Sequence, residues 1–253
     1  MKVTFLGTGT SQGVPVISCD CRVCRSDHAQ DKRLRVSVLL EMADKTVVID
    51  SGPDFRYQML RAGVKDLDAI VFTHEHKDHV AGLDDIRPFN YLKNKSIDIF
   101  AVDRVQAALR REFAYIFEDS GYFGLPKVNM ITIDEQPFKI GETEFIPVEV
   151  MHHKLPVMGY RIGNFAYVTD AKTLSERSIE KLRGTELLVL NALQREDHIS
   201  HLTLAEAIDM AGKIGARMTY LTHLSHNMGL HREIEQELPS NIRLAYDGLK
   251  IEV

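Results

Sequence analysis

The residues with the clearest chemical potential lie in one short run from Thr73 to His79, which reads THEHKDH. His74, His76, Asp78 and His79 place three imidazoles and one carboxylate within six positions. Neutral imidazole and carboxylate are ligands that zinc and manganese accept, and so compact a backbone can aim them at two adjacent ions. A polar surface loop is the alternative, but this pattern should arise by chance in roughly three chains per thousand of this composition. The run therefore predicts a metal site.

A second group of potential ligands is formed by the three cysteines of the chain, Cys19, Cys21 and Cys24. An odd number of cysteines clustered so tightly is a poor disulfide framework. Thiolates at this spacing can occupy three corners of a zinc tetrahedron, which then needs a fourth ligand from elsewhere. We expect a structural zinc here, and free loop cysteines are the alternative.

The elements that hold these residues are expected to be many short strands with helices between them. The predicted strands are Val3–Leu6, Val36–Glu41, Thr46–Ile49, Ala69–Phe72, Asp98–Val102, Val128–Ile133, Glu144–Val150, Gly159–Ile162, Phe165–Thr169, Leu187–Leu190, Met218–Leu221, Ile242–Ala245 and Lys250–Glu252. The predicted helices are Phe55–Ala62, Val105–Ile116, Ser175–Leu182, Leu204–Ile214 and Arg232–Glu237. Thr203 and Glu206 form a capping-box pattern at the start of the fourth helix. Nothing resembling a linker interrupts the chain, so one two-sheet α/β domain over residues 1–253 is expected.

Chemically capable residues recur where these strands end. Asp50, His74, His152, Asp170 and His223 each follow a predicted strand directly or within two residues. Ligands from separate strand ends can converge on one edge of a sheet, where a rigid scaffold holds their geometry. Singly, each would more often be a structural polar group; together they favour ligation. Asp50 is the exception, because it is expected to support a ligating histidine rather than to bind metal itself.

Bulk composition excludes several classes of protein. The chain has 253 residues, 44% of them hydrophobic, and a net charge of −5. This negative charge argues against stable binding to nucleic acid by bulk electrostatics. No apolar run approaches the length needed to span a bilayer, and the first apolar stretch is too short for a secretory signal. We expect a cytoplasmic protein.

These motifs resemble the metallo-β-lactamase fold superfamily, whose signature His-x-His-x-Asp-His stands here at positions 74–79. Within it, the sequence is similar to the PhnP-like branch, which contains cyclic-phosphate phosphodiesterases related to the tRNA 3′-processing endonuclease tRNase Z. Further matching stretches are GTGTSQGVP at 7–15, the cysteine loop at 19–24, IDSGPD at 49–54, AGLDD at 81–85, HHKLP at 152–156, YVTD at 167–170 and LTHLSH at 221–226. The resemblance implies an αββα four-layer sandwich, in which two mixed β-sheets carry helices on their outer faces.

The resemblance also implies how the ligands are divided. One metal would be held by His74, His76 and His152; the second by Asp78, His79 and His223; Asp170 would bridge both. His153 follows His152 directly, so either could be the ligand. The position two residues before the Lys-Leu pair favours His152. For the cysteine loop, the resemblance implies His226 as the fourth zinc ligand. His231 lies within reach of the same loop in the sequence and stays open as a competitor.

The expected chemistry follows from two divalent ions, zinc or manganese, about 3.5–4 Å apart, which can share a hydroxide and draw charge from phosphate oxygens. Asp78 can both ligate and orient that hydroxide. His201, just before the capped helix, is a candidate to contact the phosphate or to protonate the leaving oxygen. The related enzymes keep an active-site histidine at such a place. Solvent-exposed loop histidines are the alternative reading of His198 and His201.

The expected function is therefore a dinuclear metal-dependent phosphodiesterase that hydrolyses small cyclic or nucleotide-like phosphodiesters through a metal-bridging hydroxide. The alternatives are a tRNase Z-like endonuclease, a lactone or thioester hydrolase of the same fold, and a non-catalytic metal-organised binding protein. The expected partner is a small-molecule substrate rather than a membrane or a stably bound nucleic acid, and a homodimer is possible by resemblance.

Overall fold

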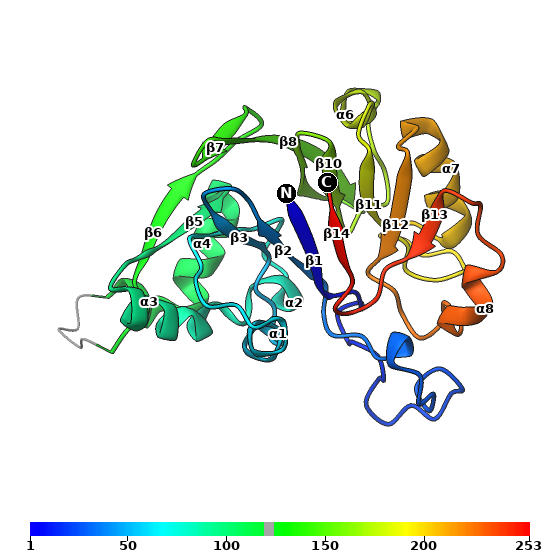
Figure 1. Ribbon diagram of the computed structural model, residues 1–253, viewed down its shortest axis with the longest axis horizontal. Helices are drawn as coiled ribbons and strands as arrows, with labels where there is room; N and C mark the ends of the chain where they lie inside the picture. The colour runs from blue at the N-terminus through cyan, green and yellow to red at the C-terminus, as the bar shows by residue number, and fades with distance from the viewer. Residues whose placement is uncertain (119–123) are drawn as a thin grey trace.

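Two β-sheets form the centre of the molecule in the computed structural model, which describes residues 1–118 and 124–253 (Figure 1). Within these residues each sheet has seven strands. The first sheet has, in spatial order, β14 (Lys250–Glu252), β1 (Lys2–Gly7), β2 (Ser37–Glu41), β3 (Thr46–Ile49), β4 (Ala69–Val71), β5 (Ile97–Ala101) and β6 (Val128–Thr132). The second has β13 (Ile242–Leu244), β12 (Met218–Thr222), β11 (Leu187–Asn191), β10 (Phe165–Val168), β9 (Leu155–Ile162), β8 (Thr143–His152) and β7 (Phe138–Ile140).

Both sheets are mixed, as predicted. In the first, β3 to β6 run parallel, whereas β14, β1, β2 and β3 pair antiparallel. In the second, β10 to β13 run parallel and β7 to β10 pair antiparallel. Parallel neighbours deliver their carboxyl ends to the same edge, where open α/β sheets place their ligands.

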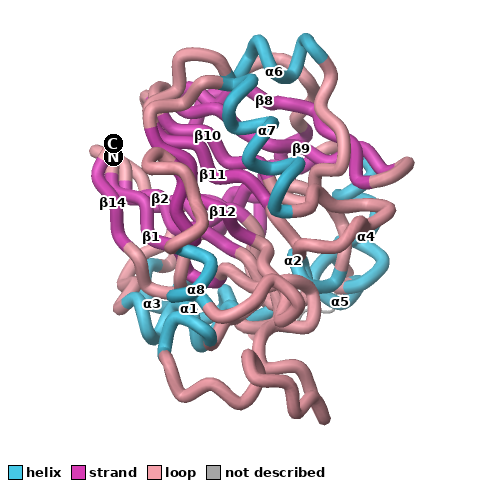
Figure 2. The backbone as a smooth tube through the Cα atoms, turned by 90° about the vertical axis from the view of Figure 1, so that its right-hand side faces the viewer, coloured by secondary structure: helices cyan, strands magenta, loops and turns pink. Residues whose placement is uncertain are grey.

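Helices cover the outer face of each sheet, which completes the expected αββα sandwich (Figures 1 and 2). The first sheet carries α1 (Phe55–Ala62), α3 (Arg87–Lys93) and α4 (Asp103–Glu112), and the second carries α6 (Glu176–Leu182), α7 (Leu204–Ile214) and α8 (His231–Glu235). Two short helices, α2 (Lys77–Val80) and α5 (Ala114–Phe117), lie in connections. The strands bury both of their faces. One apolar cluster lies between the two sheets, a second lies between the first sheet and its helices, and a third lies between the second sheet and its helices.

Several predicted elements need correction. The predicted helix Val105–Ile116 is wrong as one unit, because Phe113 has non-helical dihedral angles (φ −119°, ψ 41°) and separates α4 from α5. This break lets Phe113 and Ile116 pack against the apolar cluster under the first sheet. The predicted strand Gly159–Ile162 starts earlier, at Leu155, which pairs with His152 across a tight two-residue turn. Three elements, β7, α2 and α3, lie outside all of the predicted strands and helices.

Among the residues that the structure describes, no helix is both long enough and apolar enough to cross a membrane.

Candidate metal centre

The predicted ligands come together where strands of both sheets end. His74 follows β4, His152 ends β8, Asp170 follows β10 and His223 follows β12. Asp170 and His223 have positive φ angles of 57° and 58°, in the left-handed region that residues other than glycine rarely adopt. Asp50, which follows β3, is similar at 62°. Backbone strain of this kind clusters at functional sites, where the surrounding structure holds it in place.

Asp170 lies between two buried imidazoles. Its Oδ2 atom is 3.3 Å from Nε2 of His79, and its Oδ1 atom is 3.2 Å from Nε2 of His223. The Asp78 carboxylate also approaches both rings, at 3.2 Å from Nε2 of His79 and 3.7 Å from Nε2 of His223. Ligand atoms around a tetrahedral zinc ion are separated by about 3.3 Å, given bond lengths of roughly 2.0–2.1 Å. These four side chains are therefore spaced as metal ligands are.

His74 and His76 line the other side of the site, together with His152. The ring centroids of His74 and His76 are 4.5 Å apart, and that of His152 is 5.2 Å from His76. At this site, two compact sets of potential ligand atoms consist only of residues predicted to bind the two ions. The first is His74, His79 and Asp170, and the second is Asp78, His79 and His223. His76 is close by ring contact but belongs to neither set. The structure thus brings all seven predicted residues together without separating them into the two implied groups.

The buried nitrogens of this site lack the partners that burial demands. His74, His79 and His223 are at most 1% exposed, yet the Nε2 atoms of all three make no hydrogen bond to any described residue. A buried polar atom without a partner costs roughly 1–3 kcal/mol, so a cation at their common focus would remove a substantial penalty. The donor set of imidazoles and carboxylates fits a divalent transition metal.

Charge at the site also favours a cation. Burial opposes ionisation of Asp78 and Asp170, but the neighbouring histidines hold the pKa of both carboxyls well below the usual range. Burial likewise opposes protonation of His79, yet the three nearby carboxylates raise its pKa well above the ordinary value. Two buried carboxylates thus remain ionised, and positive charge is what they require.

Hydrogen bonds behind the ligands orient their rings. Asp50 accepts a 2.7 Å hydrogen bond from Nδ1 of His79, and it accepts two more, each 2.8 Å, from the amide and hydroxyl of Thr73. Nδ1 of His152 donates to the carbonyl of Ser200 at 2.9 Å. With Nδ1 occupied in this way, Nε2 is the atom presented to a metal. The sequence suggested the supporting role of Asp50, but it gave no signal for Thr73 or Ser200.

His201 lies beside two of the predicted ligands, His152 and His223. It is 8% exposed, and its ring centroid is 4.5 Å from that of His152 and 4.8 Å from that of His223. The reading of His201 as an exposed loop residue is therefore wrong. Burial, with His223 alongside, lowers the pKa of His201 to about 2. His198, which is half-buried, lies further out, with its ring 5.1 Å from that of His201.

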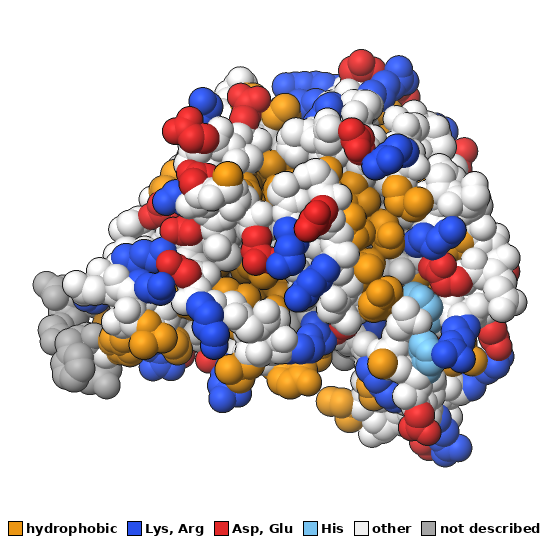
Figure 3. Space-filling model, in the orientation of Figure 1, with side chains coloured by type: hydrophobic (Ala, Val, Ile, Leu, Met, Phe, Trp, Pro, Cys, Tyr) orange, Lys and Arg blue, Asp and Glu red, His pale blue; other side chains and the backbone are white. Residues whose placement is uncertain are grey.

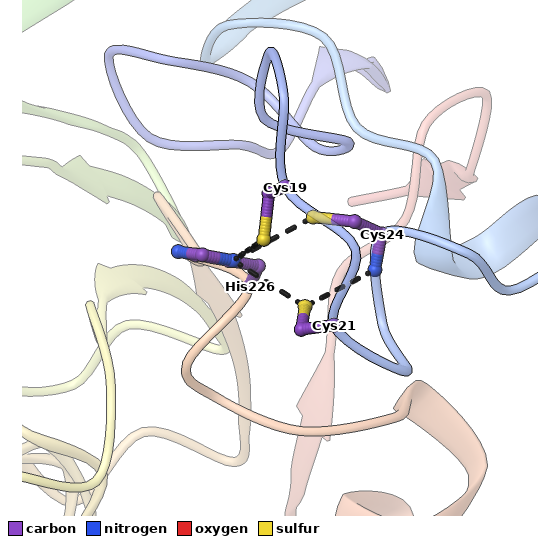
Figure 4. A group of neighbouring side chains, drawn as sticks. All are labelled: Cys19, Cys21, Cys24 and His226. Carbon is purple, nitrogen blue, oxygen red and sulfur yellow. Dashed lines mark hydrogen bonds between the residues drawn. The ribbon is translucent and has the colours of Figure 1, made fainter.

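The cysteine loop forms a second candidate metal site (Figure 4). Nδ1 of His226 is 3.2 Å from Sγ of Cys19, 3.4 Å from Sγ of Cys21 and 3.5 Å from Sγ of Cys24. These four residues form a compact set of potential ligands. His231, the competitor, is turned elsewhere: its Nδ1 lies 3.1 Å from the guanidinium of Arg33. The structure therefore brings His226, and not His231, to the thiols.

Comparison with known proteins defines the class. Residues 45–224 match the family model described as Beta-lactamase superfamily domain, a stretch that holds all seven residues predicted for the dinuclear site. The ribonuclease Z of Pyrobaculum aerophilum is 24% identical over 257 residues, covering 82% of this chain and 87% of that protein. The chain therefore belongs to the metallo-β-lactamase fold superfamily, and it is a hydrolase of that fold.

Two proteins with higher sequence identity to this chain narrow its placement within the superfamily. A diphosphatase from the PhnP family has a crystal structure that matches with a TM-score of 0.93 and 42% identity, covering 100% of this chain and 97% of that one. The predicted PhnP-like branch is thereby confirmed. The octanoyltransferase of Porphyromonas gingivalis is also 42% identical, over 253 residues and 99% of this chain. The chain spans only 51% of that relative's length, so its name describes a protein about twice as long.

Proposed function

We propose that this protein is a dinuclear metal-dependent phosphodiesterase acting on small cyclic or nucleotide-like phosphodiesters. The observation that carries this proposal is the set of buried, unpartnered imidazole nitrogens gathered around the ionised carboxylates of Asp78 and Asp170. In the proposed arrangement His74, His76 and His152 would hold one ion, Asp78, His79 and His223 would hold the other, and Asp170 would serve both.

The chain's own residues divide the remaining work. When bound, two zinc or manganese ions supply Lewis acidity, which acidifies a coordinating water and stabilises negative charge on phosphate oxygens. The ionised Asp78 accepts a hydrogen bond from the attacking water and orients it. His201 is neutral near neutral pH because of its lowered pKa, so an N–H contact to the phosphate is favoured over general-acid catalysis.

The PhnP-family relative favours a specific second candidate. That protein is named as a diphosphatase, and it shares 42% identity with this chain over nearly its whole length. A diphosphate bridge between two nucleotide-like groups presents phosphorus atoms of the same charge and substitution as a phosphodiester, so the same site can attack either. Cleavage of such a bridge is the alternative activity.

We further propose that Cys19, Cys21, Cys24 and His226 hold a structural zinc ion. The 3.2–3.5 Å separations between His226 Nδ1 and the three sulfurs support this, because zinc bonds of about 2.0–2.3 Å give ligand pairs at this distance. A reducing cytoplasm, the proposed location, keeps such thiols free to bind metal.

The test is hydrolysis of three aryl substrates, a phosphodiester, a phosphomonoester and a carboxylic ester, after loading with Mn²⁺ or Zn²⁺. We expect the phosphodiester to be cleaved fastest, and Asp170→Asn to abolish this while Asp209→Asn, a change at an exposed carboxylate of α7, retains it. Cleavage of the carboxylic ester alone would contradict the proposal and favour a lactone or thioester hydrolase.

A further inference from the structure

The loop of residues 192–203 connects β11 to α7 and carries His198 and His201. Three main-chain hydrogen bonds close its base: Leu193 N to Leu202 O at 2.9 Å, Leu202 N to Ala171 O at 2.8 Å, and Leu204 N to Gln194 O at 2.8 Å. The second of these ties the loop to the residue that follows Asp170. The tip, between Gln194 and His201, is held mainly by side chains.

The ammonium group of Lys172 contacts a residue within this tip and a residue beyond it. Nζ of Lys172 lies 3.0 Å from Oδ1 of Asp197, the residue before His198. It also lies 2.9 and 3.0 Å from the two carboxylate oxygens of Glu206. Glu206 in turn closes the capping box of α7, accepting from the Thr203 amide at 2.8 Å while its own amide donates to the Thr203 hydroxyl at 3.2 Å.

His201 depends on this backbone for its position. Its Nδ1 atom makes no hydrogen bond to a described residue and is 3.9 Å from the Asp170 carboxylate, so packing and the loop backbone place its ring. The neighbouring Ser200 carbonyl orients His152. A shift of the tip would therefore move His201, the candidate substrate contact, whereas His152 is also held as the last residue of β8.

We propose that Lys172 is a positioning residue: its ammonium, held between Asp197 and Glu206, fixes the 197–203 segment so that His201 faces the reacting phosphate. The inference rests on the proposed function, and it assigns Lys172 no contact with substrate. The side chain of Lys172 is 19% exposed, whereas its partners Asp197 and Glu206 are 88% and 41% exposed, so the lysine is the shielded member that ties two exposed carboxylates together. An ion pair with no positioning role would contribute little to stability and nothing to turnover.

The chain offers a matched control. Lys213 forms an ion pair with Asp209 on the exposed side of the same helix, α7, with a separation of 2.8 Å. Lys172→Met and Lys213→Met thus remove the same charge from lysines that both pair with carboxylates of α7. Lys172→Arg retains the cation.

With an aryl phosphodiester as substrate, Lys172→Met should lower kcat about 10- to 100-fold, the loss that a small misplacement of a catalytic group causes. Lys172→Arg should recover most of this loss, and Lys213→Met should match the parent protein. Because Lys172 acts through His201, Lys172→Met should add little in a His201→Ala background. Fully additive losses, or a Lys172→Met protein as active as Lys213→Met, would overturn the inference.

Hydrogen exchange supplies a readout that does not depend on activity. The amides of Leu202 and Leu204 should exchange faster in Lys172→Met than in the parent or in Lys213→Met, because the loop opens more often. If the parent protein cleaves no phosphodiester, the proposed function fails but the positioning role can still be tested. In that case, equal amide exchange in Lys172→Met and the parent protein would refute the positioning role. Should Lys172→Met not fold, the exchange and turnover of Lys172→Arg decide, since that variant must resemble the parent.

Discussion

At the scale of single residues, the site is defined by imidazole nitrogens that nothing in the described chain satisfies. The sequence predicted the imidazoles of His74, His76 and His79 because their spacing is so unusual. It predicted His152 and His223 because each follows a predicted strand and lies in a stretch that resembles the family pattern. What spacing cannot convey is which nitrogen of a ring faces inward, since that depends on a remote partner such as Asp50 or the Ser200 carbonyl.

His201 provides the first test at this scale. His201→Ala should reduce turnover of an aryl phosphodiester by about 10²- to 10³-fold, because the lost N–H stabilises charge developing on the phosphate. Metal content should stay at the parent value, since His201 is not one of the seven proposed ligands. Elemental analysis beside steady-state kinetics checks both, and a parallel loss of metal would show instead that His201 is a ligand.

At the scale of helices and strands, local sequence signals predict some boundaries and contacts, whereas others depend on tertiary packing. Helix α7 was predicted with its correct bounds, because a capping box and an amphipathic repeat are local signals. The break at Phe113 was missed because the tertiary packing of the half-buried Phe113 and Ile116 overrides helical propensity there. The pairing of the cysteine loop with His226 was implied by resemblance alone; the competing His231 was excluded only by its contact with Arg33, which lies far from it in sequence.

The cysteine loop gives a prediction about zinc. Cys21→Ser should lose about one zinc ion per chain, because a hydroxyl does not replace a thiolate ligand, while the dinuclear site keeps its metals. Elemental analysis of parent and variant measures this, and Ser26→Ala, in the same loop but outside the four ligands, is the control. Unchanged zinc in Cys21→Ser would refute the structural site.

The contact between the N-terminal loop and α8 gives a prediction about pH. His231 is 5% exposed, and burial beside Arg33 lowers its pKa to about 4. In the unfolded chain this imidazole titrates near 6.5, so between about pH 6.5 and 4 the unfolded state binds more protons. The free energy of unfolding should therefore fall as pH falls through this window, by at most about 3 kcal/mol from this residue.

His231→Gln removes that titration and should flatten the same part of the stability curve. Urea unfolding of both proteins at about pH 7 and pH 4.5 measures how steeply the free energy of unfolding of each changes with pH. The comparison concerns the slopes rather than the absolute stability, because glutamine also changes packing at neutral pH. Equal slopes in parent and variant would show that His231 is not a source of acid sensitivity.

At the scale of the whole molecule, the two sheets meet directly behind the site. The Tyr160 hydroxyl in the second sheet donates to the Phe72 carbonyl of the first at 2.7 Å, and the Met158 amide donates to the Thr73 carbonyl at 3.1 Å. These bonds adjoin His74, so the strand that presents the metal-binding run is fixed by the opposite sheet. A pattern along the sequence could indicate two sheets, but not this register between them.

Charge across the whole molecule bears on the choice between the phosphodiesterase and the endonuclease. The net charge is −5, and basic and acidic side chains are interspersed on the face seen in Figure 3. Between the signature motif and His152, residues 80–118 and 124–151 are largely taken up by helices and strands of the sandwich, in place of an extended arm for gripping RNA. A polyanion such as a tRNA precursor is held mainly by phosphate contacts with lysine and arginine.

We therefore expect no retention of a tRNA precursor in a gel-shift experiment at about 0.15 M salt and protein concentrations below roughly 1 μM. The ribonuclease Z of Pyrobaculum aerophilum serves as the positive control. Lowering the salt tenfold should produce at most weak, sequence-independent retention, because only screening has been removed. Retention at the higher salt, accompanied by cleavage of the precursor at a single position, would contradict the small-substrate proposal and establish the endonuclease instead.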